Sequence, residues 1–393
     1  MLNLKNKVVF KGDRTLWYVV IGLMLASLIV VYSSTGSLAF RVRGGNTSYY
    51  LIKQLFLMFG CMVVILTLQS FHYKYFLSFA KIVLGMSLIF LLWAKFAGTT
   101  LNDAGRWVTI PGIGFTFQPS EMAKLGIIMY CARAIAFEQT EECCSNNVLW
   151  RMTLVVPVLF LIFMENFSTS ALLGGVCLVM LFVGRLYWKT YAKLIGVIVG
   201  LLILMLAVVF IVPEKHLKSA GRLLTVKSRI EHFVNPSETD SDDSYQSDQA
   251  KIAVAKGGLM GLGPGNSVQR NFLPHPYSAG IVMLLYLIIL YRVGVIVRRC
   301  TRMFPAILVA GLGLCIVFQA LINMGVCVGL FPVTGQPLPL VSMGGTSLLF
   351  TSASFGMILS VSHTFSEEGE REEKEKLKMA AQGINEEEEN EEN

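Results

Sequence analysis

One short stretch of the chain gathers basic residues of the kind that bind phosphate. Between residues 213 and 230, five cations accompany a single acidic residue, Glu214, and apolar residues are interleaved among them. The cations are Lys215, Lys218, Arg222, Lys227 and Arg229. The pattern is typical of an amphipathic helix on a membrane surface. There the cations could hold phosphate or diphosphate groups; adhesion to anionic lipid is the alternative.

A second group of charges lies at the start of an apolar run. Glu121 and Lys124 are three positions apart, so they share one face of a helix. A charge at the edge of a membrane span is costly and is therefore a functional candidate; the alternative is an ion pair that compensates itself at the helix entrance. Upstream, Arg106 and Trp107 could serve a site, or could be a headgroup contact and an interfacial anchor.

Two segments have backbones suited to a cavity wall. Five glycines lie between Gly257 and Gly265, but no Gly-Lys-Ser/Thr follows, so this is not a P-loop. Residues 331–347 contain three prolines and three glycines and cannot form a regular helix. Irregular backbone at membrane depth needs protein or a cavity beside it. We expect a re-entrant loop that lines an outward cavity.

The composition shows which elements must position these residues. Of 393 residues, 54% are hydrophobic and 15% charged, against about a quarter charged in soluble domains. The eight cysteines have no spacing typical of a disulfide framework or zinc site. At about 20 residues per crossing, we predict an all-α polytopic membrane protein with about ten transmembrane helices. The apolar runs are roughly 16–34, 51–69, 79–97, 121–137, 152–164, 170–185, 193–212, 279–298, 304–330 and 346–362.

Lysine and arginine in the short loops predict the orientation. They occur before the first span and in alternate loops, at Lys74 and Lys81, Arg185 and Lys189, and Arg298 and Arg299. Both termini are therefore expected in the cytoplasm, and the long loop 213–278, between spans 7 and 8, outside. We expect a cytoplasmic tail at 1–15, a transmembrane domain at 16–365, and a disordered acidic tail at 366–393, which holds 12 Glu against 4 basic residues.

Several motifs occur together and in order, and the chain resembles the SEDS family (shape, elongation, division and sporulation) from about residue 13 to residue 363. The match rests on Ala104-Gly105-Arg106-Trp107, Phe117-Gln118-Pro119-Ser120-Glu121 with Lys124, Tyr245-Gln246, Gly257-Gly258 to Ser267, Leu273-Pro274, Gln319 with Asn323-Met324-Gly325-Val326, and Pro337-Leu338-Pro339 to Ser342-Met343-Gly344-Gly345-Thr346-Ser347. The opening Asp13-Arg-Thr-Leu-Trp and Val31-Tyr32-Ser33-Ser34 resemble the cell-division branch most.

The resemblance implies a peptidoglycan glycosyltransferase that polymerises lipid II, a disaccharide-pentapeptide on undecaprenyl diphosphate, at the outer face of the bacterial cytoplasmic membrane. It implies a class B penicillin-binding transpeptidase and other divisome membrane proteins as partners, no nucleic acid, and a place at the division septum. We expect no cofactor and no metal site. The expected substrate-binding residues are Arg106, Trp107, Glu121, Lys124, Lys215, Lys218, Arg222, Gln246, Ser342, Gly344 and Gly345.

The chain departs from the family after Leu273-Pro274. The family continues with an Asp-Phe-Ile segment and a Glu-Glu pair, and that Asp is usually assigned to catalysis. Here Ser278 runs directly into the apolar Ala279-Gly280-Ile281, about fifteen residues short. The catalytic residue is therefore unknown; Asp248, Glu231 and His275 are weak candidates in the same loop. We predict that this chain forms no polymer until an Asp-containing segment is restored.

Two other classes of function fit parts of the pattern. A lipid II flippase or transporter would also have about ten spans, membrane charges and broken helices. Its polar groups would be expected near the bilayer midplane, however, and here they are concentrated in outward segments. A non-catalytic divisome scaffold would tolerate the missing segment. Polymer formation, measured beside lipid II translocation, separates the three.

Overall fold

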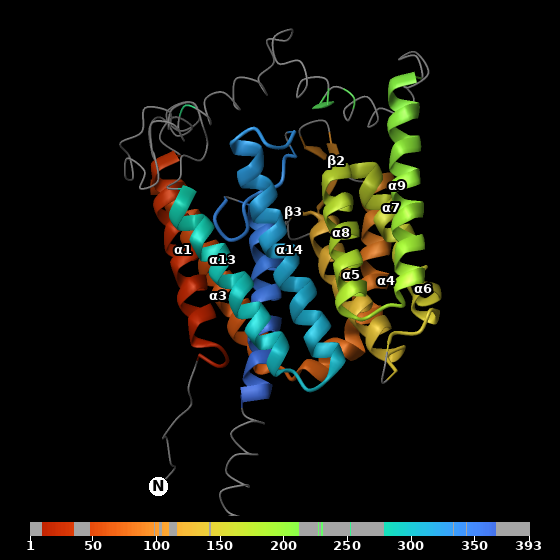
Figure 1. The fold of residues 1–393 in the computed structure, drawn as a ribbon. Helices are drawn as coiled ribbons and strands as arrows, with labels where there is room; N and C mark the ends of the chain where they lie inside the picture. Colours follow the sequence, from red (N-terminus) through yellow and green to blue (C-terminus); the bar gives the residue numbers. More distant parts are fainter. Residues whose placement is uncertain are drawn as a thin grey trace, which may run out of the picture.

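The computed structural model describes residues 10–34, 48–97, 99–101, 104–109, 116–140, 143–211, 279–332, 334–342 and 344–366, with isolated positions at 227, 229, 230 and 252. Long helices run roughly parallel or antiparallel to one another and form one bundle (Figure 1). The predicted all-α membrane fold is confirmed.

The helices follow the apolar runs of the sequence. They are α1 (Arg14–Ser34), α3 (Ser48–Ser70), α4 (Tyr73–Ala97), α5 (Pro119–Phe137), α6 (Asn147–Met152), α7 (Val155–Glu165), α8 (Phe167–Val183), α9 (Trp188–Ile211), α13 (Ala279–Arg299), α14 (Met303–Cys327) and a C-terminal helix, Gly345–Ser366. Each of the ten predicted runs coincides with a helix. Seven of these helices are long and apolar enough to cross a membrane, so the chain is an integral membrane protein. The count of ten spans stays a prediction.

Three short strands, which the sequence did not predict, lie between α4 and α5. They are β1 (Thr99–Leu101), β2 (Ala104–Thr109) and β3 (Thr116–Phe117), paired antiparallel in the order β1-β2-β3. Val108 pairs with Phe117, and both side chains are buried against Ala94 and Phe90 of α4. The sheet therefore fixes the residues directly before α5.

Helices α14 and α9 are opposites in burial. In α14, 72% of the most apolar window is buried, because this helix packs against α5, α8 and α13. In α9 the share is 6%, and Val209 is its single buried residue. Helix α14 is therefore the centre of the bundle, whereas the surface of α9 is left for lipid.

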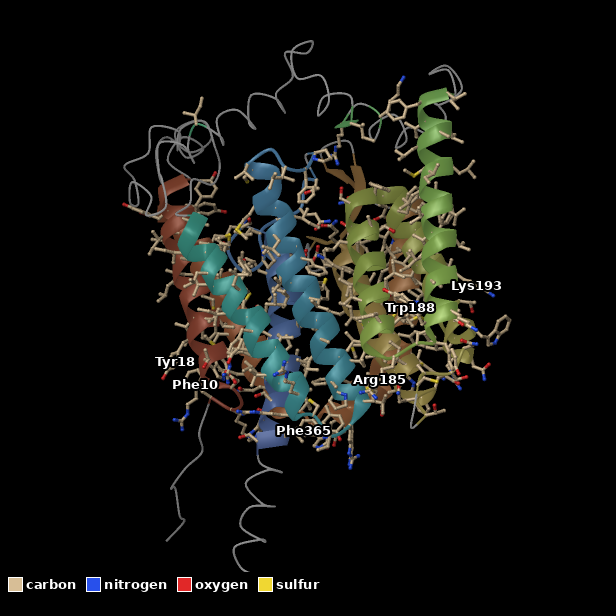
Figure 2. All side chains as sticks on the ribbon, in the orientation of Figure 1. Phe10, Tyr18, Arg185, Trp188, Lys193 and Phe365 are labelled. Atoms are coloured by element: carbon tan, nitrogen blue, oxygen red, sulfur yellow. The ribbon has the colours of Figure 1, made fainter. Side chains whose placement is uncertain are left out.

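Both described ends of the chain lie at one end of the bundle, which we call the termini end; Phe10 and Phe365 mark it (Figure 2). Asp13 caps α1 by accepting a hydrogen bond from the Leu16 N–H at 3.0 Å. The same carboxylate accepts two bonds from Nε of Arg292 on α13, at 3.1 and 3.2 Å. The Asp13 side chain is 4% exposed, so this ion pair joins α1 to α13 in a largely buried place.

The substitution Arg292→Gln should destabilise the bundle, because it leaves the Asp13 carboxylate buried without its cation. Removal of one partner of a buried pair costs about 3 kcal/mol in the free energy of unfolding. Thermal unfolding in detergent measures the loss. The control Arg298→Gln removes an exposed cation from the same helix and should change little. Equal stability of the two variants would contradict the structural role of the pair.

Candidate functional site

The first turn of α5 places two charged side chains inside the protein. Gln118 is the N-cap in extended conformation, and Pro119 begins the helix with the fixed φ that suits its first turn. Glu121 lies in that turn, where a carboxylate interacts favourably with the helix dipole. Glu121 and Lys124 are only 5% and 8% exposed, so the helix start is a buried charged site.

The two charges are paired with each other and with α14. Lys124 Nζ lies 2.8 Å from Glu121 Oε1 and donates a hydrogen bond to Gln319 Oε1 at 3.1 Å. An ammonium has three donors, so one N–H of Lys124 remains after these two partners. Gln319 in turn donates through Nε2 to the carbonyl of Pro337 at 2.8 Å. The ion pair is thus connected to the segment that follows α14.

That segment, residues 334–342, which we call the proline loop, has no regular secondary structure. Side chains from several helices donate to its backbone carbonyls. Asn323 of α14 donates to Gln336 O at 2.7 Å, and Ser27 of α1 donates to Val341 O at 2.9 Å. Tyr286 of α13 donates to Pro339 O. The loop is therefore a buried, irregular segment between helices, as the sequence predicted for a re-entrant loop.

Two residues of the proline loop have left-handed backbones. Gly335 has φ of 64°, which glycine adopts without cost. Leu340 has φ of 58° and is fully buried; for an L residue with a side chain this conformation costs about 1–2 kcal/mol. The hydrogen bonds to the carbonyls of its neighbours, Pro339 and Val341, hold it in place. Strain of this kind is characteristic of functional segments.

A cavity of about 260 Å³ lies where α5, α8 and the proline loop meet, at the end of the bundle opposite the termini end. We call it the site cavity. Its lining residues are Gln118, Glu121, Lys124, Asn166, Thr169, Gly335, Gln336, Pro337, Gly344, Thr346 and Ser347. The cavity combines a buried cation with hydroxyl and amide groups, a set that can bind an anionic or hydroxyl-rich ligand.

The structure brings only part of the predicted substrate-binding set together. Glu121, Lys124 and Gly344 line the site cavity, and Gly345 follows directly. Ser342 accepts a hydrogen bond from the Leu338 N–H at 2.9 Å, so its hydroxyl shapes the proline loop. Arg106 and Trp107 belong to β2, but their side chains lie outside the described residues. Lys215, Lys218, Arg222, Gln246 and the candidate bases Glu231, Asp248 and His275 also lie outside the described residues.

Eight of the eleven residues that line the site cavity were not predicted as site residues, among them Gln336, Asn166 and Thr169. Gln336 is 7% exposed, donates to Thr169 Oγ1 of α8 at 3.3 Å, and has an Oε1 atom without a partner among the described residues. Asn166 caps α8 by accepting a hydrogen bond from the Thr169 N–H at 3.4 Å. Gln319 and Asn323 are polar residues one turn apart in an apolar span, and this signal could have pointed to the site.

Fold and site together define a polytopic α-helical membrane protein with a buried ion pair beside an irregular loop. The family described as cell cycle protein, which unites FtsW, RodA and SpoVE, matches residues 13–367. The chain belongs to this family.

Relatives of the chain are similar over almost their whole length. One is 27% identical over 379 residues, covering 91% of this chain and 90% of its own length, and is named "Probable peptidoglycan glycosyltransferase FtsW" in Aliivibrio salmonicida. The protein of the same name in Bacillus subtilis is 26% identical over 377 residues, covering 91% of this chain and 92% of its own length.

Solved structures share the fold. One, from a study of polymerisation and crosslinking by a peptidoglycan synthase complex, has a TM-score of 0.70 at 23% identity and covers 90% of this chain and 98% of its own. The Thermus thermophilus rod shape determining protein RodA has a TM-score of 0.60 at 21% identity, covering 89% of this chain and 96% of its own.

The substitution Gln319→Leu should loosen the proline loop. It removes an acceptor from Lys124 and a donor from the Pro337 carbonyl, and each buried group left unpaired costs about 1–3 kcal/mol. Hydrogen exchange at residues 334–342 should become at least about ten-fold faster, since that factor corresponds to about 1.4 kcal/mol.

The matched control for this prediction is Gln69→Leu. Gln69 accepts from the Lys11 N–H at 3.1 Å at the termini end, far from the proline loop. Exchange at 334–342 should be unchanged in the control. Unchanged exchange in Gln319→Leu as well would show that Gln319 does not hold the loop.

Proposed function

We propose that the protein is a peptidoglycan glycosyltransferase of the cell-division type, a class that polymerises lipid II at the outer face of the cytoplasmic membrane, and that this chain has the substrate site but lacks the family's Asp-containing segment after Ser278. The observation that carries the proposal is the buried Lys124 at the site cavity, with one N–H not used by Glu121 or Gln319. Membership of the family and the names of its relatives agree with it.

The proposed reaction requires charge stabilisation. A hydroxyl of the acceptor sugar attacks the anomeric carbon of the donor, the bond from that carbon to the diphosphate breaks, and the hydroxyl proton passes to a base. The departing diphosphate lipid carries the negative charge. A lysine in a buried, preorganised site stabilises such a charge more than one in water, and this is the role we assign to Lys124. Gln336 Oε1 can accept a hydrogen bond from a sugar hydroxyl or amide.

The size of the site cavity limits what it holds. At about 260 Å³ it is smaller than most ligand pockets, which range from about 300 to 1,000 Å³. One sugar ring or the diphosphate group fits this space; the whole disaccharide-pentapeptide does not. The rest of the substrate therefore lies outside the cavity, toward the membrane surface.

The orientation that we propose places the site cavity outside and both termini in the cytoplasm. Arg185 lies at the termini end (Figure 2), and Lys189 follows in the first turn of α9. Lys74 is next to Tyr73, whose ring stacks on Phe365, and Arg298 and Arg299 end α13 at the same end of the bundle (Figure 1). These cations agree with the positive-inside rule for a cytoplasmic end. A class B penicillin-binding transpeptidase, divisome membrane proteins and a septal location are part of the same proposal. The structural neighbour from a peptidoglycan synthase complex supports such a partnership.

Lipid II should bind through the buried pair. Added lipid II should raise the thermal midpoint of the purified chain, because a ligand stabilises the state that binds it. The double variant Glu121→Gln/Lys124→Gln removes both charges and leaves neither unpaired, so it should fold. It should bind lipid II at least about ten-fold more weakly, the effect of losing one charge-assisted hydrogen bond.

The matched control is Asp13→Asn/Arg292→Gln, which removes the other described buried ion pair, at the termini end. Its affinity for lipid II should equal that of the unchanged chain. If the site-cavity double variant also keeps full affinity, Glu121 and Lys124 only hold the helices together and the substrate site is elsewhere.

The base is the part of the mechanism that the described residues do not provide. In the site cavity, the carboxylate of Glu121 is already paired with Lys124. Helix α13 begins at Ala279 and still has 21 residues, about 31 Å, which suffices for a membrane span. The chain, although about fifteen residues short after Ser278, therefore keeps this membrane span. The missing segment affects the catalytic chemistry and not the number of spans.

We predict that polymerisation requires the family's missing segment. The chain as it stands, reconstituted with its transpeptidase partner and lipid II, should form no glycan polymer. A chain with the family's Asp-containing segment inserted between Ser278 and Ala279 should form polymer, and an insert of equal length with Ala in place of that Asp should not. Gel analysis of labelled lipid II measures the product.

Two other results would change the assigned class. Polymer made by the unchanged chain and lost in Asp248→Ala would place the base at Asp248 and make the insert unnecessary. Movement of labelled lipid II across liposomes without polymer would identify a flippase. If the chain with the insert shows neither polymerisation nor translocation, the remaining class is a non-catalytic divisome scaffold.

A further inference from the structure

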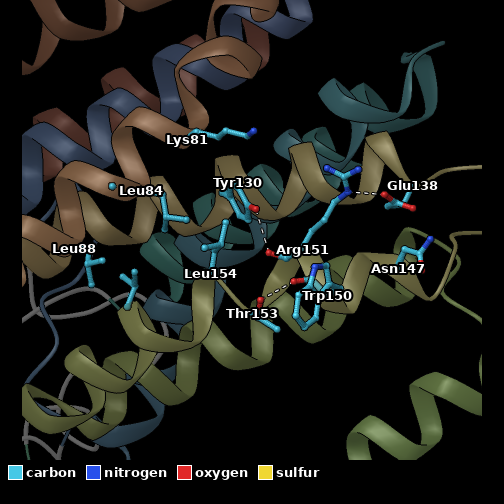
Figure 3. Close-up of a pocket in the computed structure, with 12 residues that line it drawn as sticks. Lys81, Leu84, Leu88, Tyr130, Glu138, Asn147, Trp150, Arg151, Thr153 and Leu154 are labelled. Atoms are coloured by element: carbon cyan, nitrogen blue, oxygen red, sulfur yellow. Dashed lines mark hydrogen bonds and ion pairs between the residues drawn. The ribbon is translucent and has the colours of Figure 1, made fainter.

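A second, larger hollow lies at the termini end of the bundle, far from the site cavity. It has a volume of about 770 Å³ and lies between α4, α5, α6 and α7 (Figure 3). We call it the α4–α7 groove. Its lining residues are Lys81, Leu84, Gly85, Leu88, Tyr130, Glu138, Asn147, Trp150, Arg151, Thr153, Leu154 and Val158. None of them takes part in the glycosyltransferase site described above.

One part of the groove presents cations and hydrogen-bond donors. Lys81 of α4 has no ion pair among the described residues, and Arg151 of α6 pairs with Glu138. The two cations, Lys81 and Arg151, and the carboxylate of Glu138 give the lining a net charge of +1. The guanidinium has five N–H donors, of which Glu138 accepts one from Nε. Tyr130 donates to the main-chain carbonyl of Arg151 at 3.1 Å, which fixes the position of α6 beside α5.

The other part of the groove is apolar. Leu84 and Leu88 of α4 line it together with Leu154 and Val158, and Leu84 lies close to Leu154 (Figure 3). Gly85 lies between these leucines on α4, and a Cβ atom added there would meet nothing within 4 Å. The helix backbone is therefore open to the groove at Gly85. An extended hydrocarbon chain could lie against it.

The position of the polar part matches the headgroup level of a bilayer. Trp150 is 80% exposed beside Arg151, and exposed tryptophans gather at membrane interfaces. Lys81 lies eight residues, about 12 Å, after the start of α4 at Tyr73, within reach of the same level because lysine side chains extend toward the interface. The apolar part continues from there toward the middle of the membrane.

We infer that the α4–α7 groove binds one anionic glycerophospholipid of the cytoplasmic leaflet. The phosphate lies between the ammonium of Lys81 and the guanidinium of Arg151, and one acyl chain lies along Gly85 between Leu88 and Val158. Basic pockets between transmembrane helices on the cytoplasmic side have the chemistry that selects anionic headgroups. The net positive charge of the lining is the reason to prefer an anionic over a zwitterionic lipid.

Native mass spectrometry of the full chain, released from nanodiscs of phosphatidylglycerol and phosphatidylcholine, tests the inference. We expect one retained phosphatidylglycerol molecule per chain. Lys81→Gln should reduce its affinity about five-fold, the usual contribution of one cation near a membrane surface. Gly85→Leu fills the open space beside α4 and should abolish retention.

Two controls match these variants. Lys189→Gln removes another exposed cation from the termini end, and Gly294→Leu adds the same side chain at a helical glycine of α13 that also has nothing within 4 Å. Both should retain the lipid. Circular dichroism and thermal unfolding confirm that all four variants fold, which the open space around both glycines favours.

Three outcomes would overturn the inference. Equal retention of phosphatidylcholine would show an unselective lipid surface. Loss in the controls as well as in Lys81→Gln and Gly85→Leu would place the lipid elsewhere. Displacement of phosphatidylglycerol by a polyprenyl diphosphate at equimolar concentration would show that the groove takes the diphosphate lipid instead. None of these readouts depends on polymerase activity, so the test stands apart from the proposed glycosyltransferase function.

Discussion

Backbone carbonyls at membrane depth must find hydrogen-bond donors inside the protein, because hydrocarbon provides none. The carbonyls of the proline loop need such donors most, since an irregular backbone does not satisfy its own hydrogen-bonding groups as a helix does. The donors come from Gln319 and Asn323 of α14, Ser27 of α1 and Tyr286 of α13. The positions of these helices are therefore coupled through one segment. The buried charges at the start of α5 join the same network through Gln319, so loop and ion pair stabilise each other.

The elements that the sequence predicted are those governed by local pattern. The length of each apolar run predicted a helix, and the structure has one at each run. The spacing of Glu121 and Lys124 predicted that their side chains share a helix face, as they do. The short sheet escaped prediction because its strands have only two to six residues and depend on burial of Phe117 against α4. The bond from Gln336 to Thr169 joins residues 167 positions apart. No local pattern contains such a contact, since it arises only once the helices pack.

The two ends of the bundle differ in how their lysine side chains are positioned. At the site cavity, Lys124 is buried and held by a carboxylate and an amide, so its charge is fixed in place before any ligand arrives. At the termini end, Lys81 is exposed on a surface that faces lipid, where its side chain can move with the headgroups. A fixed cation suits a reaction in which charge develops at one point. A mobile cation suits attachment to a fluid layer.

The contrast between α9 and α14 has a consequence for how the sequence can change. Helix α9 is stabilised mainly by contact between its apolar side chains and the hydrocarbon of the bilayer, because Val209 is its single buried residue. Exchanges among leucine, isoleucine, valine and phenylalanine along α9 preserve its apolar contact with the hydrocarbon. The helix can also enter the membrane before any neighbouring helix is present. Helix α14 must fit its neighbours on almost every side. Apolar substitutions are therefore tolerated in α9, whereas in α14 each substitution needs a compensating change in another helix.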